Sequence, residues 1–176
     1  KEIVKYAQLS IKLIGIGVAI PIGLLSGFAY PLLALWLGPQ YTYLVPLIWL
    51  VIMPLSVSLA VLPLHSIFTA YNKVKIPGIF SFVFGLSNVV LALILASHFE
   101  MKLYGIALAS AIVLTTKNIF FSPLYAAYIL KRDRFYFLSE LIYPMVVFGI
   151  TFVLAYSFST YLPVDTWLSL IVCGLC

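Results

Sequence analysis

The feature that most constrains this chain is the length of its apolar stretches. Five of them are long enough to cross a bilayer as a helix, which takes about 20 apolar residues. Backbone amides in hydrocarbon need hydrogen-bond partners within their own segment, so each stretch is predicted to be helical. The predicted helices cover residues 6–37, 43–71, 76–96, 104–130 and 136–160, and a truncated helix begins over 166–176. The sequence therefore predicts an all-α, polytopic transmembrane bundle forming a single region over 1–176, a fragment of a longer membrane protein.

Composition excludes the main soluble classes of protein. Charged residues make up only 9% of the 176 residues and apolar residues 64%, whereas a soluble domain has about 25% charged residues. So few charges could not solvate the surface of a soluble domain of this size. A soluble enzyme, a disordered tail and a nucleic-acid-binding domain are excluded, and no nucleic-acid partner is expected.

The basic residues predict an orientation in the membrane. Eight of the ten fall on one side: Lys1, Lys5, Lys12, Lys73, Lys75, Lys131, Arg132 and Arg134. Only Lys102 falls on the opposite side, and Lys117 lies within a span. By the positive-inside rule, the Lys1, Asn72 and Lys131 ends are predicted to be cytoplasmic, in a multi-pass protein of the plasma membrane. The net charge of +5 is thus a signal of topology.

Small residues and prolines predict how the helices pack and bend. Gly15, Ala19, Gly23 and Gly27 recur every four residues on the first helix, a pattern that lets another helix backbone approach closely in lipid. Seven prolines fall within the spans, and each removes a helical hydrogen bond. They predict either bent, mobile helices of the kind that transporters use or static kinks in a crowded bundle.

The fourth predicted helix carries the strongest candidate site. Its polar face, about 160° wide at the helical angular step, includes Ser110, Lys117 and Asn118. Lys117 lies midway between Tyr104 and Leu130, where a lysine costs at least about 2.5–3.5 kcal/mol on insertion. It should therefore face a wet cavity or a partner. It is either a cationic contact for an anionic group of a substrate, or half of a structural pair with a carboxylate or with carbonyls freed by a proline.

Other polar residues are weaker candidates. Asn88 could line the same cavity or bridge two helices, and His65 could carry a proton for ion coupling or be a satisfied interfacial histidine. Lys12 and Glu140 are expected to snorkel near the cytoplasmic ends of their helices. Cys173 and Cys176 are interpreted as small hydrophobic residues. Since no nucleotide-binding loop, catalytic triad or metal-ligand cluster is visible, no enzyme activity, metal or cofactor is expected.

The order of these features resembles a known transporter family. The first long stretch ends in Pro-Leu-Leu-Ala-Leu-Trp-Leu-Gly-Pro-Gln-Tyr (residues 31–41), and the second closes on Ile-Phe-Thr-Ala-Tyr-Asn-Lys-Val-Lys-Ile-Pro (67–77). A helix with a central Ser87-Asn88 follows, and then Tyr-Gly-Ile-Ala-Leu-Ala-Ser-Ala (104–111). Over about residues 5–130 this run is similar to the polysaccharide-transport branch of the multidrug/oligosaccharidyl-lipid/polysaccharide flippase superfamily.

The resemblance implies a fold, a function and partners. Members have two six-helix lobes around a central cavity, sometimes with two extra C-terminal helices, and this chain would be the second lobe, from about the ninth helix to the start of the fourteenth. They move lipid-linked sugars across the plasma membrane by alternating access, and cationic cavity residues are thought to meet the lipid phosphates. Lys117 falls on a helix where that role is plausible. The implied partners are a lipid-linked sugar, membrane lipid and the missing N-terminal lobe.

Two other functions stay open. An ion-coupled exporter of drugs or small molecules would need an acidic ion site, which no mid-span Asp or Glu supplies here. A membrane-embedded enzyme of glycan or lipid assembly would need a polar catalytic group at the membrane face, to which only the Glu140 region and residues 131–134 could contribute.

Overall fold

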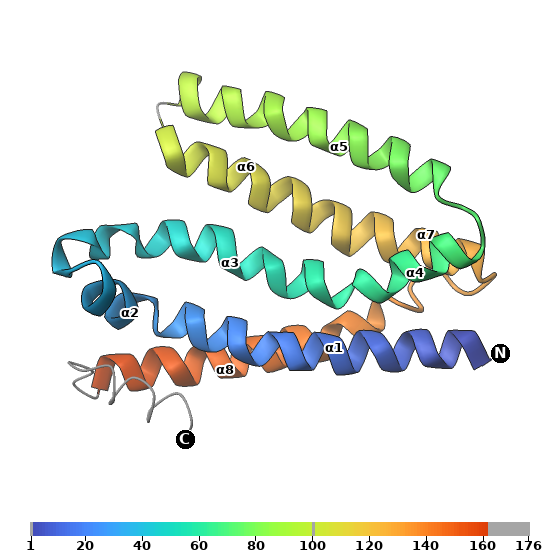
Figure 1. The fold of residues 1–176 in the computed structure, drawn as a ribbon, viewed down its shortest axis with the longest axis horizontal. Helices are drawn as coiled ribbons and strands as arrows, with labels where there is room; N and C mark the ends of the chain where they lie inside the picture. The colour runs from blue at the N-terminus through green and yellow to red at the C-terminus, as the bar shows by residue number, and fades with distance from the viewer. Residues whose placement is uncertain (1, 100, 162–176) are drawn as a thin grey trace.

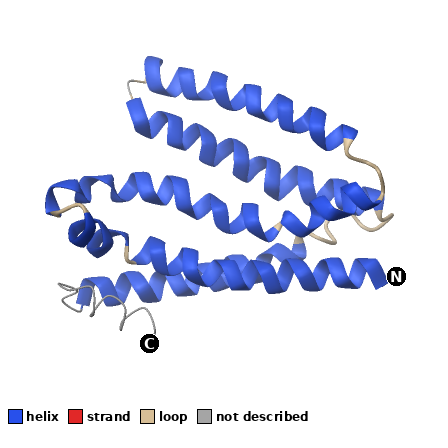
Figure 2. Ribbon diagram, viewed as in Figure 1, coloured by secondary structure: helices blue, strands red, loops and turns tan. Residues whose placement is uncertain are grey.

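The computed structural model describes residues 2–99 and 101–161, and in this part of the chain every regular element is a helix (Figures 1 and 2). The truncated helix predicted over 166–176, with both cysteines, and the terminal Lys1 lie outside the described residues. The helices are α1 (Glu2–Gly27), α2 (Ala29–Trp36), η1 (Pro39–Leu44), α3 (Val45–Ala60), α4 (Leu62–Ala70), α5 (Lys75–Leu93), η2 (Ile94–His98), α6 (Lys102–Thr116), η3 (Lys117–Phe121), α7 (Ser122–Ile129), η4 (Ser139–Leu141) and α8 (Ile142–Tyr161).

Five helical stretches are long and apolar enough to cross a membrane, which confirms the predicted all-α polytopic bundle. They are Glu2–Gly27, Pro39–Ala60, Lys75–Ser97, Lys102–Ile129 and Ser139–Tyr161. The predicted first and second helices are each divided. The first breaks at Phe28, just before Pro31, which cannot donate to the carbonyl of Gly27. The second breaks at Val61, and Pro63 lies in the first turn of α4.

The spans form an open row rather than a closed bundle (Figure 1). α1 packs on α8 and on α3, α3 packs on α6, and α6 packs on α5. The two chain segments that meet most extensively, α1 and α8, come from opposite ends of the described chain. α5 lies at the edge of the row, and none of its residues is buried. An apolar helix exposed in this way is compatible with lipid as the solvent.

The glycine ladder of α1 lies against α8. A methyl group added at Gly15 would lie 2.6 Å from Cγ of Pro144, and one added at Gly27 would lie 2.4 Å from Cβ of Ala155. Gly23 faces Thr151 in the same way, and Ala19 between them is fully buried. Small side chains therefore set the separation between the first and the last described spans.

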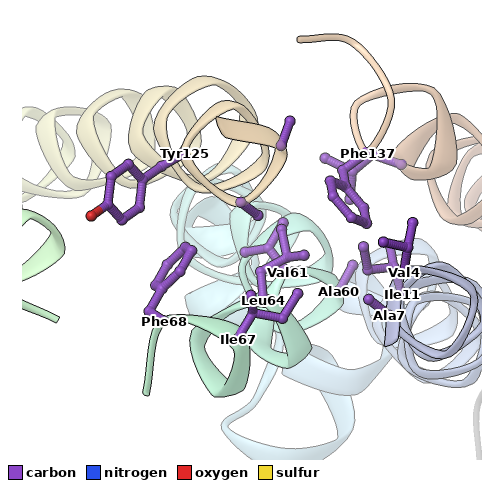
Figure 3. Close-up of a cluster of buried hydrophobic side chains, with 13 residues drawn as sticks. Val4, Ala7, Ile11, Ala60, Val61, Leu64, Ile67, Phe68, Tyr125 and Phe137 are labelled. Carbon is purple, nitrogen blue, oxygen red and sulfur yellow. The ribbon is translucent and has the colours of Figure 1, made fainter. Parts of the chain in front are cut away.

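The largest apolar core lies toward the end of the row that holds the N-terminus of α1 (Figures 1 and 3). It joins α1, the junction between α3 and α4, α7, and the segment that leads into α8. Its buried members are Val4, Ala7, Ile11, Ala60, Val61, Leu64, Ile67, Phe68, Tyr125, Ala126, Ala127, Phe137 and Leu141. This core holds α4 and α7 together at the same end as two basic loops.

Candidate functional site

Lys117 begins a turn of π-helix inside the fourth span. The turn, η3, covers Lys117–Phe121, and the backbone N–H of Ser122 donates to the carbonyl of Lys117, five residues back. Pro123 follows directly and has no N–H with which to continue the α-helical ladder. Such π turns widen a helix by one residue and are frequent at functional sites. The candidate lysine is thus placed on a local irregularity of the helix.

The Lys117 side chain is half-buried and has no carboxylate partner among the described residues. Glu140 is the buried carboxylate among the described residues, and it is paired with Lys12 and not with Lys117. The Lys117 ammonium lies near enough to His65 of α4 to disfavour a positive charge on that ring. The His65 ring is also half-buried and meets Phe68 edge-on, with 5.5 Å between the ring centroids. The structure thus relates two residues that the sequence singled out separately.

Asn118 makes a contact between spans. It is only 6% exposed, and its Nδ2 donates to Oγ of Ser58 in α3 at 2.8 Å. Ser58 Oγ in turn donates to the carbonyl of Pro54 at 3.0 Å. This chain of bonds links η3 to α3 and holds the π turn in place. Ser58 was missed by the sequence analysis, although a hydroxyl one turn after a proline was a signal for it.

Asn88 and Ser110 form a second bridge. Nδ2 of Asn88 in α5 donates to Oγ of Ser110 in α6 at 3.3 Å, and Ser110 Oγ lies 3.4 Å from Asn88 Oδ1. Of the two roles predicted for Asn88, the structure therefore shows the bridge between helices.

The four residues predicted to contact substrate do not gather in one pocket. A groove of about 390 Å³ lies between α3 and α6 and is lined by Ser110, Pro54, Ala111 and apolar side chains. Lys117, Asn118 and Asn88 are not part of its lining. On the polar face of the fourth span, Ser110 and Asn118 each form a hydrogen bond to a neighbouring helix. Lys117 on the same face has no carboxylate partner among the described residues.

A larger polar network lies between α1 and the start of α8. The Lys12 ammonium lies 2.9 Å from Oε2 of Glu140, and Gln8 Nε2 donates to Glu140 Oε1 at 2.8 Å. The hydroxyl of Tyr136 donates to Gln8 Oε1 at 3.0 Å, and Lys12 Nζ lies 4.4 Å from the ring centroid of Tyr143. Beyond the snorkelling expected of each residue, Lys12 and Glu140 meet each other in a network that sequence spacing could not reveal.

Comparison with known proteins gives one informative match. The chain is 38% identical over 173 residues to the uncharacterized membrane protein EpsK of Bacillus subtilis (strain 168). The chain is thus similar in sequence to a membrane protein. The match covers 98% of this chain and 34% of EpsK, so the chain spans about a third of the length of that relative. No protein-family model and no solved structure matches the chain.

Proposed function

We propose that this chain is part of a transporter that flips a lipid-linked oligosaccharide across the plasma membrane by alternating access, for the assembly of a surface polysaccharide. The observation that carries the proposal is the half-buried Lys117 ammonium, which lies in the fourth span with no carboxylate partner among the described residues. An intramembrane charge is costly and usually faces a cavity or a substrate path. In this proposal a first lobe of the protein supplies the other wall of the cavity.

The chemistry of a lipid-linked sugar fits a lone cation. Its phosphate groups are the charged part that must cross the hydrocarbon region, and an ammonium is a common phosphate contact. The proline-linked breaks at Phe28 and Val61 support bending of the spans during alternating access.

The decisive experiment measures flux. The protein is reconstituted, as its gene encodes it, in liposomes that contain a fluorescent lipid-linked oligosaccharide. The Lys117→Ala variant should lower flux about 10- to 100-fold, since a hydrogen bond to a charged group contributes about 1.5–3 kcal/mol. Lys117→Arg should retain part of the flux. Lys102→Ala, which removes an exposed lysine at the first residue of the same span, is the matched control and should leave flux unchanged.

Other outcomes separate the competing functions. Unchanged flux in Lys117→Ala would remove the assigned role of Lys117. Export of small cationic drugs, with no movement of the lipid-linked sugar, would favour an ion-coupled exporter. Turnover of a lipid–sugar donor without flux would favour an enzyme. A scan of single cysteines along residues 106–122, made after replacement of Cys173 and Cys176 by serine, tests whether the Lys117 face is wet: a dry face would contradict the cavity.

A further inference from the structure

Two basic loops lie at the same end of the row of helices (Figure 1). One joins α4 to α5 and carries Lys73, with Lys75 as the first residue of α5; the other follows α7. We call their cationic residues the basic end surface: Lys73, Lys75, Lys131, Arg132 and Arg134. All five are exposed, and the only acidic residue within these loops is Asp133.

The two loops begin with the same backbone motif. The N–H of Lys73 donates to the carbonyl of Phe68 at 2.8 Å, and the N–H of Arg132 donates to the carbonyl of Ala127 at 2.9 Å, each five residues back. The residue before each cation has a positive φ, 51° at Asn72 and 50° at Lys131. This is the Schellman ending of a helix. It fixes the direction in which each loop leaves its helix and places a cation at the same position after both.

Aromatic side chains join the first loop to the helix that carries the second. The hydroxyl of Tyr125 in α7 donates to the carbonyl of Lys73 at 3.2 Å. The Tyr125 ring also meets Phe68 of α4, with 5.2 Å between centroids, and stacks on Phe121 at 5.5 Å. Phe121 stacks in turn on Phe80 of α5 at 4.4 Å. The ends of α4, α5 and α7 thus form one unit, and the basic end surface is a defined structure rather than two independent tails.

The depth of this surface indicates what it meets. Lys75 begins one candidate span, and residues 131–134 follow the end of another at Ile129, so the cations lie at the boundary of the membrane. Large exposed aromatic side chains flank them: Tyr128 is 76% exposed and Phe135 is 69% exposed. Aromatic rings at this level are typical of the headgroup region.

We propose that the basic end surface binds the headgroups of anionic phospholipids. Four net positive charges on a rigid frame, with aromatic rings at headgroup depth, complement phosphates in the adjacent leaflet. Arginine and lysine both form strong charge-assisted hydrogen bonds with phosphate oxygens. An acidic soluble protein would meet the charges but would leave Tyr128 and Phe135 exposed at the membrane boundary. The inference does not depend on which substrate the protein transports.

The test compares lipid binding in nanodiscs. The protein, as its gene encodes it, is placed in nanodiscs of phosphatidylcholine, and binding of a fluorescent phosphatidylglycerol is measured. Each removed charge should weaken binding about fivefold at low salt, so Lys73→Gln/Lys75→Gln and Lys131→Gln/Arg134→Gln should each weaken it about 25-fold. Binding by the unmodified protein should fall as ionic strength rises. Lys73→Arg/Lys75→Arg and Lys131→Arg should keep full binding.

Matched controls keep the inference falsifiable. Lys102→Gln removes a lysine at the opposite end of the spans and should leave binding unchanged, and thermal unfolding of every variant shows whether it has folded. Equal binding of fluorescent phosphatidylglycerol and phosphatidylcholine by the unmodified protein would overturn the proposal. So would full competition by millimolar inorganic phosphate, or full binding in both loop variants. Because this assay measures lipid binding and not transport, its result does not depend on whether the protein transports the lipid-linked sugar.

Discussion

At the scale of single residues, most of the polar side chains discussed inside this bundle form hydrogen bonds or ion pairs with one another. Asn118 donates to Ser58, Asn88 bonds with Ser110, and Glu140 is held by Gln8 and Lys12. Each of these bonds joins two spans. Polar side chains act this way in lipid because the alternative is an unsatisfied group in hydrocarbon. Lys117 differs from them, since no carboxylate or hydrogen-bond acceptor among the described residues is bonded to its ammonium.

The Lys12–Glu140 pair should respond unequally to loss of its two members. Side-chain exposure is 36% for Lys12 and 11% for Glu140, so a lysine left alone can extend toward the headgroups whereas the carboxylate cannot. Lys12→Met leaves the buried carboxylate without a cation and should therefore lower the unfolding temperature, and Glu140→Gln, which can keep the bond with Gln8, should lower it less. Thermal unfolding in detergent measures both. The double variant should recover part of the loss; strict additivity would show that the pair contributes nothing jointly.

Gly27 should not tolerate a side chain. An added Cβ would lie 2.4 Å from Cβ of Ala155 and 2.9 Å from the backbone nitrogen of Tyr156, neither of which can rotate away. Gly27→Ala should cost about 1–3 kcal/mol, as overpacking does. Gly17 is the control on the same helix: nothing lies within 4 Å of its added Cβ, so Gly17→Ala should be neutral or stabilising by up to about 1 kcal/mol. Equal unfolding temperatures for Gly27→Ala and Gly17→Ala in detergent would contradict the packing of α1 on α8.

At the scale of elements, prolines divide long spans into shorter helices. The π turn at Lys117–Phe121 precedes Pro123, and α4 begins one residue before Pro63. The turn that carries Lys117 is braced by the bond from Asn118 to Ser58, so the position of the lysine depends on a contact between spans. The local geometry of the candidate site is a property of two helices and not of one.

Replacement of Pro123 should move Lys117 without unfolding the protein. Pro123→Ala restores an N–H that can donate to the carbonyl of Ile119, which favours an ordinary α-helical turn. Flux of the lipid-linked sugar should fall several-fold, while thermal unfolding stays within about 1 kcal/mol of the unmodified protein. Pro46→Ala is the matched control, since Pro46 lies in the first turn of α3, where the missing N–H is of no consequence. Loss of flux in both variants would show that the π turn has no special role.

At the scale of the whole molecule, the described spans form a row whose edge helix, α5, is uncovered, and whose cations concentrate at one end. The predicted orientation places that end in the cytoplasm. It also places Met101, beside the start of α6, on the outer side, and Phe135, in the loop after α7, on the inner side.

Cysteine labelling tests this orientation in intact cells. After Cys173 and Cys176 are replaced by serine, Met101→Cys and Phe135→Cys introduce one thiol each without changing a charge. Both positions are exposed, at 38% and 69%. A membrane-impermeant maleimide should label Met101→Cys directly and Phe135→Cys only after the cells are permeabilised. The reverse pattern would invert the topology and place the basic end surface outside.

The number of spans and their helical character follow from the sequence alone. Five apolar stretches of spanning length must be helices, because hydrocarbon offers no partner for a free backbone amide. The lone charge of Lys117 within a span and the small-residue spacing of α1 are also visible without a structure. These features are local: each depends on residues that are neighbours along the chain or share one face of one helix.

The partners of the polar side chains depended on the tertiary structure. Glu140 meets Gln8 across 132 positions of sequence, and Asn118 meets Ser58 across 60. Such pairs depend on the relative depth and rotation of two helices, which proline breaks and glycine contacts set together. The amino-acid sequence was therefore enough to show that this protein consists of membrane-spanning helices and that Lys117 is a charged residue within one of them. The packing of the spans was needed to show that Lys12 has a carboxylate partner, Glu140, and that Lys117 has no such partner among the described residues.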